Sequence, residues 1–140
     1  MKIFRHVKGF SSLLLLTMFS SCTDNNNSSS VNKSIVGTWS WVKTDGGIAF
    51  NIHDTPESTG KNIDINFFDN SRYFVYTNGV LSEQGTYRLG SKISIVDHST
   101  KTTVQFSKGE EMMIEKIDGL NLELSQNAND GIGSSYLRKK

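Results

Sequence analysis

The chain has 140 residues, with 15 basic and 14 acidic side chains, one cysteine and one proline. A single cysteine excludes a disulfide within the chain, so stability has to come from a packed core. Residues 22–140 carry 12 basic and 14 acidic side chains, a net charge of −2, which argues against a nucleic-acid partner because that would call for a clustered basic face.

The first 21 residues are predicted to be a secretory signal peptide. Three basic residues stand first (Lys2, Arg5 and Lys8), an apolar run follows over residues 10–19, and two serines end the segment. Small residues at this place are what a signal peptidase accepts. The apolar run is about half of the roughly 20 residues that a membrane-spanning helix needs, so we expect the segment to be removed and not retained.

Cys22 follows the two serines directly. A cysteine behind small residues resembles the bacterial lipobox, although Phe19 stands where that pattern most often has leucine. The resemblance implies that the Cys22 sulfur carries a diacylglycerol and that the new amine receives an acyl chain such as palmitate. Because each buried methylene contributes about 0.8 kcal/mol, several chains would hold the protein on a membrane of the cell envelope. The alternative is an ordinary secretory signal followed by a free thiol.

Residues 22–34 are predicted to be the lipidated cysteine and a flexible polar tether. Residues 23–34 are mostly asparagine and serine with one apolar side chain, Val31, so the segment cannot bury itself. A flexible chain of this length typically reaches about 20 Å. Residues 35–140 then suit one domain of modest size.

From Ile35 onward the pattern consists of short β-rich runs separated by turn residues, without a convincing amphipathic helix. Asn78-Gly79 predicts a tight hairpin turn, because both central residues of a type I′ turn need positive φ. Gly90-Ser91 predicts another turn, and residues 44–61 are predicted to be one long loop. The predicted strands cover residues 35–43, 62–68, 72–77, 80–89, 92–97, 101–107, 112–117, 120–125 and 134–139.

About eight or nine short strands joined by tight turns indicate an all-β antiparallel meander. A long meander leaves exposed edges unless it curls and closes, so we expect a single up-and-down β-barrel. An immunoglobulin-like sandwich is the rival, but it usually needs longer connections. Alternation along the strands predicts that the inward side chains are Trp41, Ile65, Phe67, Tyr73, Tyr87, Val104, Phe106 and Leu122.

Val36-Gly37-Thr38-Trp39 near the start of the first strand, followed by a single-chain meander, resembles the lipocalins. More closely, residues 35–140 are similar to the small lipocalin-like lipoproteins of Bacteroidetes envelopes. The supporting segments are Gly85-Thr86-Tyr87, residues 114–119 and Tyr136-Leu137-Arg138-Lys139. The resemblance implies that Trp39 closes the barrel floor, that Arg138 packs over its ring, and that Gly37 lets the neighbouring backbone approach closely.

The interior of a barrel of this size is either filled by side chains or holds one small ligand, and both readings stay open. The long loop is the main functional suspect, because loops of more than about 12–15 residues tend to be functional or disordered. The loop lids the open barrel end in lipocalins. The ligand-binding candidates are Trp41, Phe50, Ile52, Phe67, Tyr73, Tyr87 and Phe106.

No motif predicts an enzyme, a cofactor or a metal centre. His53-Asp54 and Asp97-His98 lack partners at ligand spacing, and Met112-Met113 would face opposite sides of a strand. We expect a lipid-anchored envelope protein that captures a small apolar molecule without covalent chemistry. The alternatives are a module that binds or inhibits another envelope protein, and a purely structural component. The oligomeric state and the choice between the periplasm and the cell surface are left open.

Overall fold

The computed structural model describes Val31 and residues 34–140. The predicted signal peptide, Cys22 and most of the predicted tether therefore lie outside the described residues. The elements in chain order are β1 (Gly37–Gly46), the 3-10 turn η1 (Ile48–Phe50), β2 (Ile52–Asp54), α2 (Pro56–Thr59), β3 (Ile63–Phe67), β4 (Arg72–Thr77), β5 (Val80–Ile93), β6 (Thr100–Phe106), β7 (Glu111–Ile117), β8 (Asn121–Ser125) and β9 (Ile132–Arg138).

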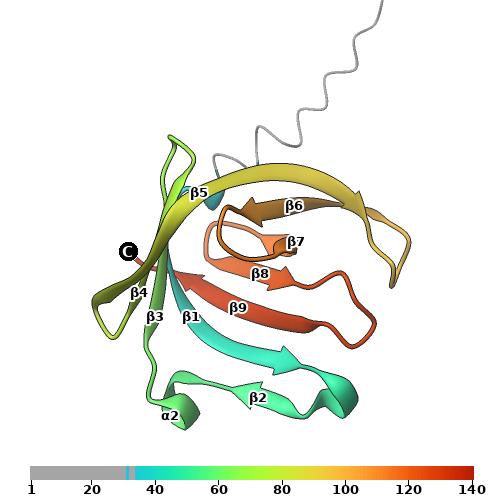
Figure 1. Cartoon of the computed structure of the whole chain (residues 1–140), viewed down its shortest axis with the longest axis horizontal. Coiled ribbons are helices and arrows are strands. Elements are labelled where there is room, and N and C mark those ends of the chain that lie inside the picture. The colour runs from blue at the N-terminus through green and yellow to red at the C-terminus, as the bar shows by residue number, and fades with distance from the viewer. Residues whose placement is uncertain (1–30, 32–33) are drawn as a thin grey trace, which may run out of the picture.

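The strands form one antiparallel sheet that closes on itself (Figure 1). β1 pairs with β3, each strand from β3 to β8 pairs with the next, and β9 returns to pair with β1, from Trp39 opposite Arg138 to Gly46 opposite Ile132. Eight strands therefore make a closed up-and-down barrel, as the strand pattern predicts, and not two stacked sheets. The ninth strand, β2, adds to the end of β1 through residues 44–46.

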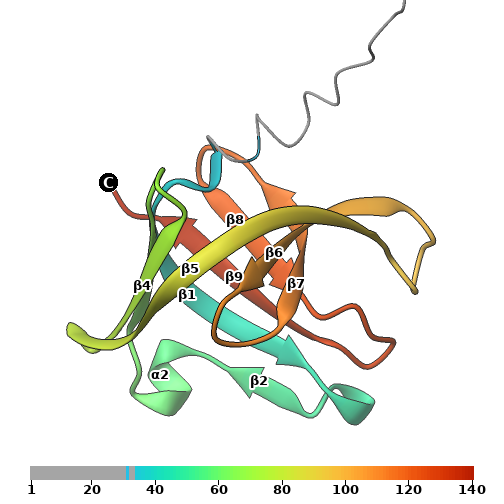
Figure 2. The same cartoon turned by 45° about the horizontal axis from the view of Figure 1, so that its top comes forward.

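The barrel has two distinct ends (Figure 2). Residues 34–36 lie at one end together with the β3–β4 turn, the β7–β8 turn and the end of β9; we call this the closed end. The connection between β1 and β3, the β4–β5 turn and the β6–β7 turn lie at the opposite end, which we call the distal end. Because successive strands run in opposite directions, the β3–β4 and β7–β8 turns fall at one end and the β4–β5 and β6–β7 turns at the other.

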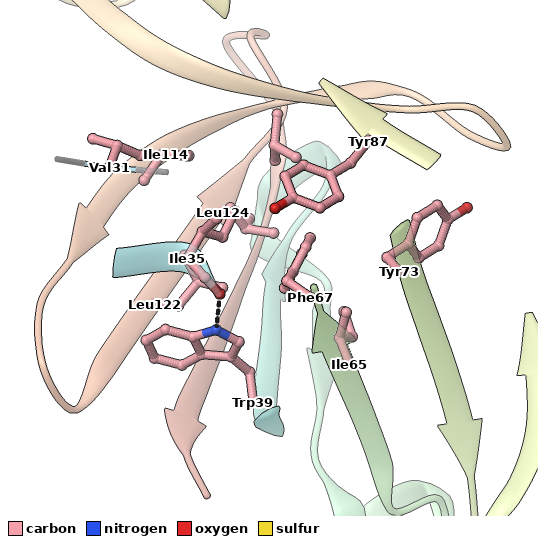
Figure 3. Packing of buried hydrophobic residues seen from close by; sticks show 11 residues of the cluster. Val31, Ile35, Trp39, Ile65, Phe67, Tyr73, Tyr87, Ile114, Leu122 and Leu124 are labelled. Atoms are coloured by element: carbon pink, nitrogen blue, oxygen red, sulfur yellow. Dashed lines mark hydrogen bonds between the residues drawn. The ribbon is translucent and has the colours of Figure 1, made fainter. Parts of the chain in front are cut away.

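One hydrophobic core fills the closed end and the middle of the barrel (Figure 3). Every side chain predicted to point inward belongs to this core or packs on it except Trp41, which is buried outside the cluster. Ile35 is fully buried over the end of the barrel, beside the Trp39 ring, and Val31 lies against Ile114. The buried cluster consists of Val31, Ile35, Trp39, Ile65, Phe67, Tyr73, Tyr87, Val104, Ile114, Leu122 and Leu124.

The prediction of a single long loop over residues 44–61 is wrong. The first strand continues to Gly46, and the segment then forms η1, β2 and α2 before β3 begins. β1 and β2 form a hairpin in which Asp45 pairs with His53. Thr55 caps α2 by accepting a hydrogen bond from the Ser58 backbone N–H at 3.2 Å. Such short elements escape prediction because three or four residues give no readable period.

The predicted turn at Gly90-Ser91 is also wrong. The strand β5 runs through both residues to Ile93, so two predicted strands are one, and the turn comes at residues 94–99. Gly90 serves packing and not turning, since a Cβ there would lie 3.1 Å from the Thr103 hydroxyl oxygen. The Asn78-Gly79 turn is confirmed, with φ of 51° and 78°.

Candidate functional site

Trp39 and Arg138 close the barrel floor from opposite ends of the domain sequence. The Trp39 indole is fully buried, and its Nε1 donates a hydrogen bond to the Ile35 carbonyl at 2.8 Å (Figure 3). The Arg138 guanidinium carbon lies 4.1 Å from the centre of the Trp39 ring, so the cation–π contact implied by the resemblance is present. The indole therefore joins the segment before β1 to the end of β9.

Arg138 also ties down the backbone that leads into β1. Its Nη1 donates to the Val36 carbonyl at 2.9 Å, and its Nη2 donates to the Ser34 carbonyl. Gly37 leaves room for this arrangement, because a Cβ there would lie 2.3 Å from Nη1 and its φ of +137° disfavours other residues. These three residues hold the closed end shut.

Four of the ligand-binding candidates come together as one aromatic cluster inside the barrel. The Phe67 and Tyr87 rings meet edge to face with centroids 5.1 Å apart, and Tyr73 and Phe106 do so at 4.9 Å. Phe67, Tyr73 and Tyr87 are buried, whereas Phe106 keeps part of its surface exposed. The first three act mainly as core, and only Phe106 could touch a molecule entering from the distal end.

The polar ends of the two core tyrosines are satisfied within the barrel wall. Tyr73 donates to Glu83 and reaches the Lys108 carbonyl at 3.2 Å, while Tyr87 donates to the Phe68 carbonyl at 2.9 Å. Burial and the neighbouring Glu83 carboxylate raise the pKa of Tyr73 to about 12. A neutral phenol that is already hydrogen-bonded suits a structural role.

Trp41 is buried on the next inward position of β1, and its polar atom is also used internally. Its Nε1 donates to the Thr44 hydroxyl at 2.9 Å, and that hydroxyl lies 2.7 Å from the Ser134 hydroxyl of β9. Trp41 pairs with Tyr136 across the seam between β1 and β9. The indole face is thus fixed in orientation toward the distal half of the interior.

Inward-facing apolar side chains near the distal end stay partly exposed. Val75, Phe106 and Met112 pack on the core, yet each is only half-buried. They lie in the last part of β4, at the end of β6 and at the start of β7, so all three are next to distal connections. Each therefore leaves part of its apolar surface uncovered by the core. Val75 and Met112 were missed as candidates because alternation alone does not tell how deeply a position lies.

The connection after β1 displays two large apolar side chains at the distal end. Ile48 and Phe50 of η1 are 79% and 74% exposed, and Ile52 of β2 is half-buried. Ala49 and Phe50 have φ of 56° and 52°, an unusual left-handed conformation for such residues. Exposed apolar side chains on a strained backbone are a feature of binding sites.

Both histidines of these pairs are exposed. His53 Nδ1 lies 3.0 Å from Asp45 at the surface, and His98 is an exposed turn residue with φ of 57°. Among residues 31 and 34–140, no three histidine, cysteine or acidic side chains are grouped so that they could hold a metal ion. Within the same residues, no helix has both the length and the hydrophobicity to cross a bilayer.

Comparison with known proteins found no protein-family model, no curated protein and no solved structure that matches the chain. The class of this protein is therefore inferred from its fold. The chain forms a closed, eight-stranded antiparallel β-barrel with one extra strand, which is consistent with a lipocalin-like fold.

Proposed function

We propose that this chain is a lipid-anchored, lipocalin-like protein of the bacterial envelope that binds a small apolar molecule at the distal end of its barrel. Membership of the small Bacteroidetes lipoproteins is part of this proposal. Cys22 would carry the acyl chains, and the segment ahead of Val31 would join it to the barrel. No catalytic residue or cofactor takes part, because binding requires only a shaped apolar surface.

The observation that carries the binding proposal is the partial exposure of inward apolar side chains at the distal end. Val75, Phe106 and Met112 offer apolar surface that faces the interior and is not used up by packing. Ile48 and Phe50 add apolar surface at the same end. A molecule that covers these side chains removes their apolar area from water, at about 25 cal/mol per Å².

The anchor is tested by replacing Cys22 with Ser and following the protein in membrane and soluble fractions. We expect the native chain to stay with membranes and the variant to be released. A variant that remains in the membrane fraction would contradict lipidation at Cys22. Mass spectrometry of the native protein should also find the added mass of a diacylglycerol on the peptide that begins at this residue.

Ligand binding is tested with the apolar fluorescent probe N-phenyl-1-naphthylamine and with native mass spectrometry of the extracted protein. Val75→Trp should block the distal interior and weaken probe binding at least tenfold. The matched control Val80→Trp adds the same group on the exposed start of β5 and should leave binding unchanged. Equal probe binding by both variants would sink the proposal of a distal apolar site.

A second candidate function is capture of a protein partner through η1. The specific observation is the strong exposure of Ile48 and Phe50 on a strained turn. The double substitution Ile48→Ser and Phe50→Ser separates the two functions. Loss of probe binding would assign η1 to the ligand site, whereas intact probe binding with loss of a co-purified envelope protein would favour the partner.

A further inference from the structure

The outer surface of the barrel carries a feature that is separate from the distal interior. Met113 lies in β7 between two inward residues, Met112 and Ile114, so its side chain points outward. An outward residue of a small barrel normally meets solvent, but Met113 is only 2% exposed and its outward neighbour Thr103 only 1%. Something covers this part of the wall.

The cover consists of two connections that meet over β6, β7 and β8. The β5–β6 connection (residues 94–99) and the β8–β9 connection (residues 126–131) project on the same side of the barrel (Figures 1 and 2). Asn127 joins them, because its Oδ1 accepts a hydrogen bond from the Ile95 backbone at 2.8 Å and its Nδ2 donates to the Ile93 carbonyl at 3.0 Å.

A pocket of about 220 Å³ lies between these connections, and we call it the outer pocket. Met113, Val96 and Ala128 give it an apolar part, and Met113 forms its base because the side chain is almost fully covered. The volume is below the roughly 300–1,000 Å³ of sites for drug-sized ligands, so the pocket suits a single small ring.

The two ionisable side chains that line the outer pocket are paired with each other, and Asp97 beside them leaves one net negative charge in this group. Lys101 Nζ lies 2.5 Å from a Glu115 carboxylate oxygen and 3.1 Å from an Asp97 carboxylate oxygen. Both carboxylates raise the pKa of Lys101, and Glu115 has the larger effect. Lys101 and Glu115 are the ionisable residues that line the pocket. An anionic ligand would meet this net negative charge with Lys101 already paired, so an anion is disfavoured and a neutral ligand fits the pocket.

The same groups keep hydrogen-bonding capacity for a ligand. Lys101 has three N–H donors and uses two, while the Glu115 carboxylate accepts from Lys101 and from the Ser125 hydroxyl at 2.6 Å and retains further lone pairs. Ser125 donates its proton and can still accept, and the Asn129 amide lies at the rim. The presence of donors, acceptors and apolar side chains in one pocket matches a ring with hydroxyl edges and C–H faces.

We propose that the outer pocket binds a neutral, hydroxyl-bearing ring of the size of one pyranoside. The apolar part around Met113 would contact the C–H face of the ring. Lys101, Glu115, Ser125 and Asn129 would hydrogen-bond its hydroxyl groups. The site lies outside the barrel, so it is independent of the apolar site proposed at the distal end.

The test is a titration of the Cys22→Ser mature chain with neutral methyl pyranosides of gluco, galacto, manno and N-acetylglucosamine configuration. Binding is monitored through the amide chemical shifts of the protein in NMR spectra. We expect saturable shifts at residues 94–97, 113–115 and 125–131, with at least one of the four. No shift at these residues up to about 50 mM, enough to detect a millimolar Kd, would overturn the proposal.

Two further measurements fix the location and the charge preference. Ala128→Phe fills the rim of the pocket from an exposed position and should weaken binding at least tenfold, while the matched control Leu81→Phe on the exposed start of β5 should not. Shifts that survive Ala128→Phe would overturn the location. Methyl glucuronide, an anion, should bind at least tenfold more weakly than the neutral rings; equal binding would overturn the charge argument.

Discussion

Replacing Trp39 is the sharpest test of how the barrel is held closed. The indole is fully buried, donates to the Ile35 carbonyl at 2.8 Å and stacks under Arg138 at 4.1 Å. Truncating a buried tryptophan to alanine typically costs about 3–5 kcal/mol. Because Trp39→Ala also removes the hydrogen bond and the stacking partner, we expect the upper half of this range, about 4–5 kcal/mol.

Trp39→Phe separates the parts of this effect. It keeps most of the buried ring but leaves the Ile35 carbonyl without its donor, so we expect a loss of about 1–2 kcal/mol. Phe50→Ala removes an exposed aromatic ring of η1 and serves as the control, with a change within about 0.5 kcal/mol.

The assay is urea unfolding followed by far-ultraviolet circular dichroism, since tryptophan fluorescence changes with the substitution itself. For a domain of about 100 residues, a loss of 4 kcal/mol also lowers Tm by more than about 15 °C. A Trp39→Ala variant within about 1 kcal/mol of the native chain would refute the reasoning, because a fully buried indole cannot be removed so cheaply from a packed core.

Three other changes test single features of the fold. Gly37→Ala should lower the free energy of unfolding by about 1–3 kcal/mol because of the positive φ at this position, and by more if the new side chain displaces Arg138 from the indole. Gly119→Ala is the control, because Gly119 has open space around it, and it should leave the free energy of unfolding unchanged in the same assay. Hydrogen bonds from the Leu120 and Asn121 backbones lower the pKa of Asp118 to about 2. Because the pKa of Asp118 is lower in the folded chain, its ionised carboxylate stabilises the fold at pH values above about 3.8, the pKa in the unfolded chain. This stabilisation is lost as the pH falls toward 2. Asp118→Asn should therefore be less stable than the native chain at pH 6, and the difference should shrink as the pH falls toward 2; a constant difference across this range would exclude the carboxylate as the cause. Arg138→Lys should keep the positive charge but lower the urea midpoint, because an ammonium group cannot bridge two carbonyls and stack in the planar manner of a guanidinium; an unchanged midpoint would show that charge alone suffices.

The barrel follows from local sequence signals to a large extent. Alternation in Ile63–Phe67 and in the later strands identified the inward side chains, and the Asn78-Gly79 turn fixed one hairpin. These signals are local because the period of a strand and the φ of a turn depend on neighbours in the chain.

The errors concern glycine and short elements. Gly90 looked like a turn residue, but its missing side chain makes space for Thr103, a neighbour that only the folded sheet supplies. The strand β2 exists because Ile52–Asp54 pairs with β1, and three residues carry no period of their own. Both outcomes depend on contacts that chain order does not show.

The candidate site was predicted only in part. Aromatic residues were identified as inward, but which of them are covered depends on depth along the barrel, so Phe106 differs from Phe67 and Tyr73. The outer pocket had no sequence signal at all, since Asn127 joins connections that are more than thirty residues apart. Burial of the outward Met113 is visible only after the two connections fold over it.

The hydrogen bonds from Arg138 to the carbonyls of Ser34 and Val36 have a mechanical consequence. If the protein is held by an acyl anchor at Cys22, tension along the chain reaches Val31, which packs against Ile114, and then the Arg138 guanidinium and the final strand. The load would be shared by β7, which carries Ile114, and β9, which carries Arg138. This contact would let the protein tilt on its anchor while the distal end, with η1, points into the surrounding water.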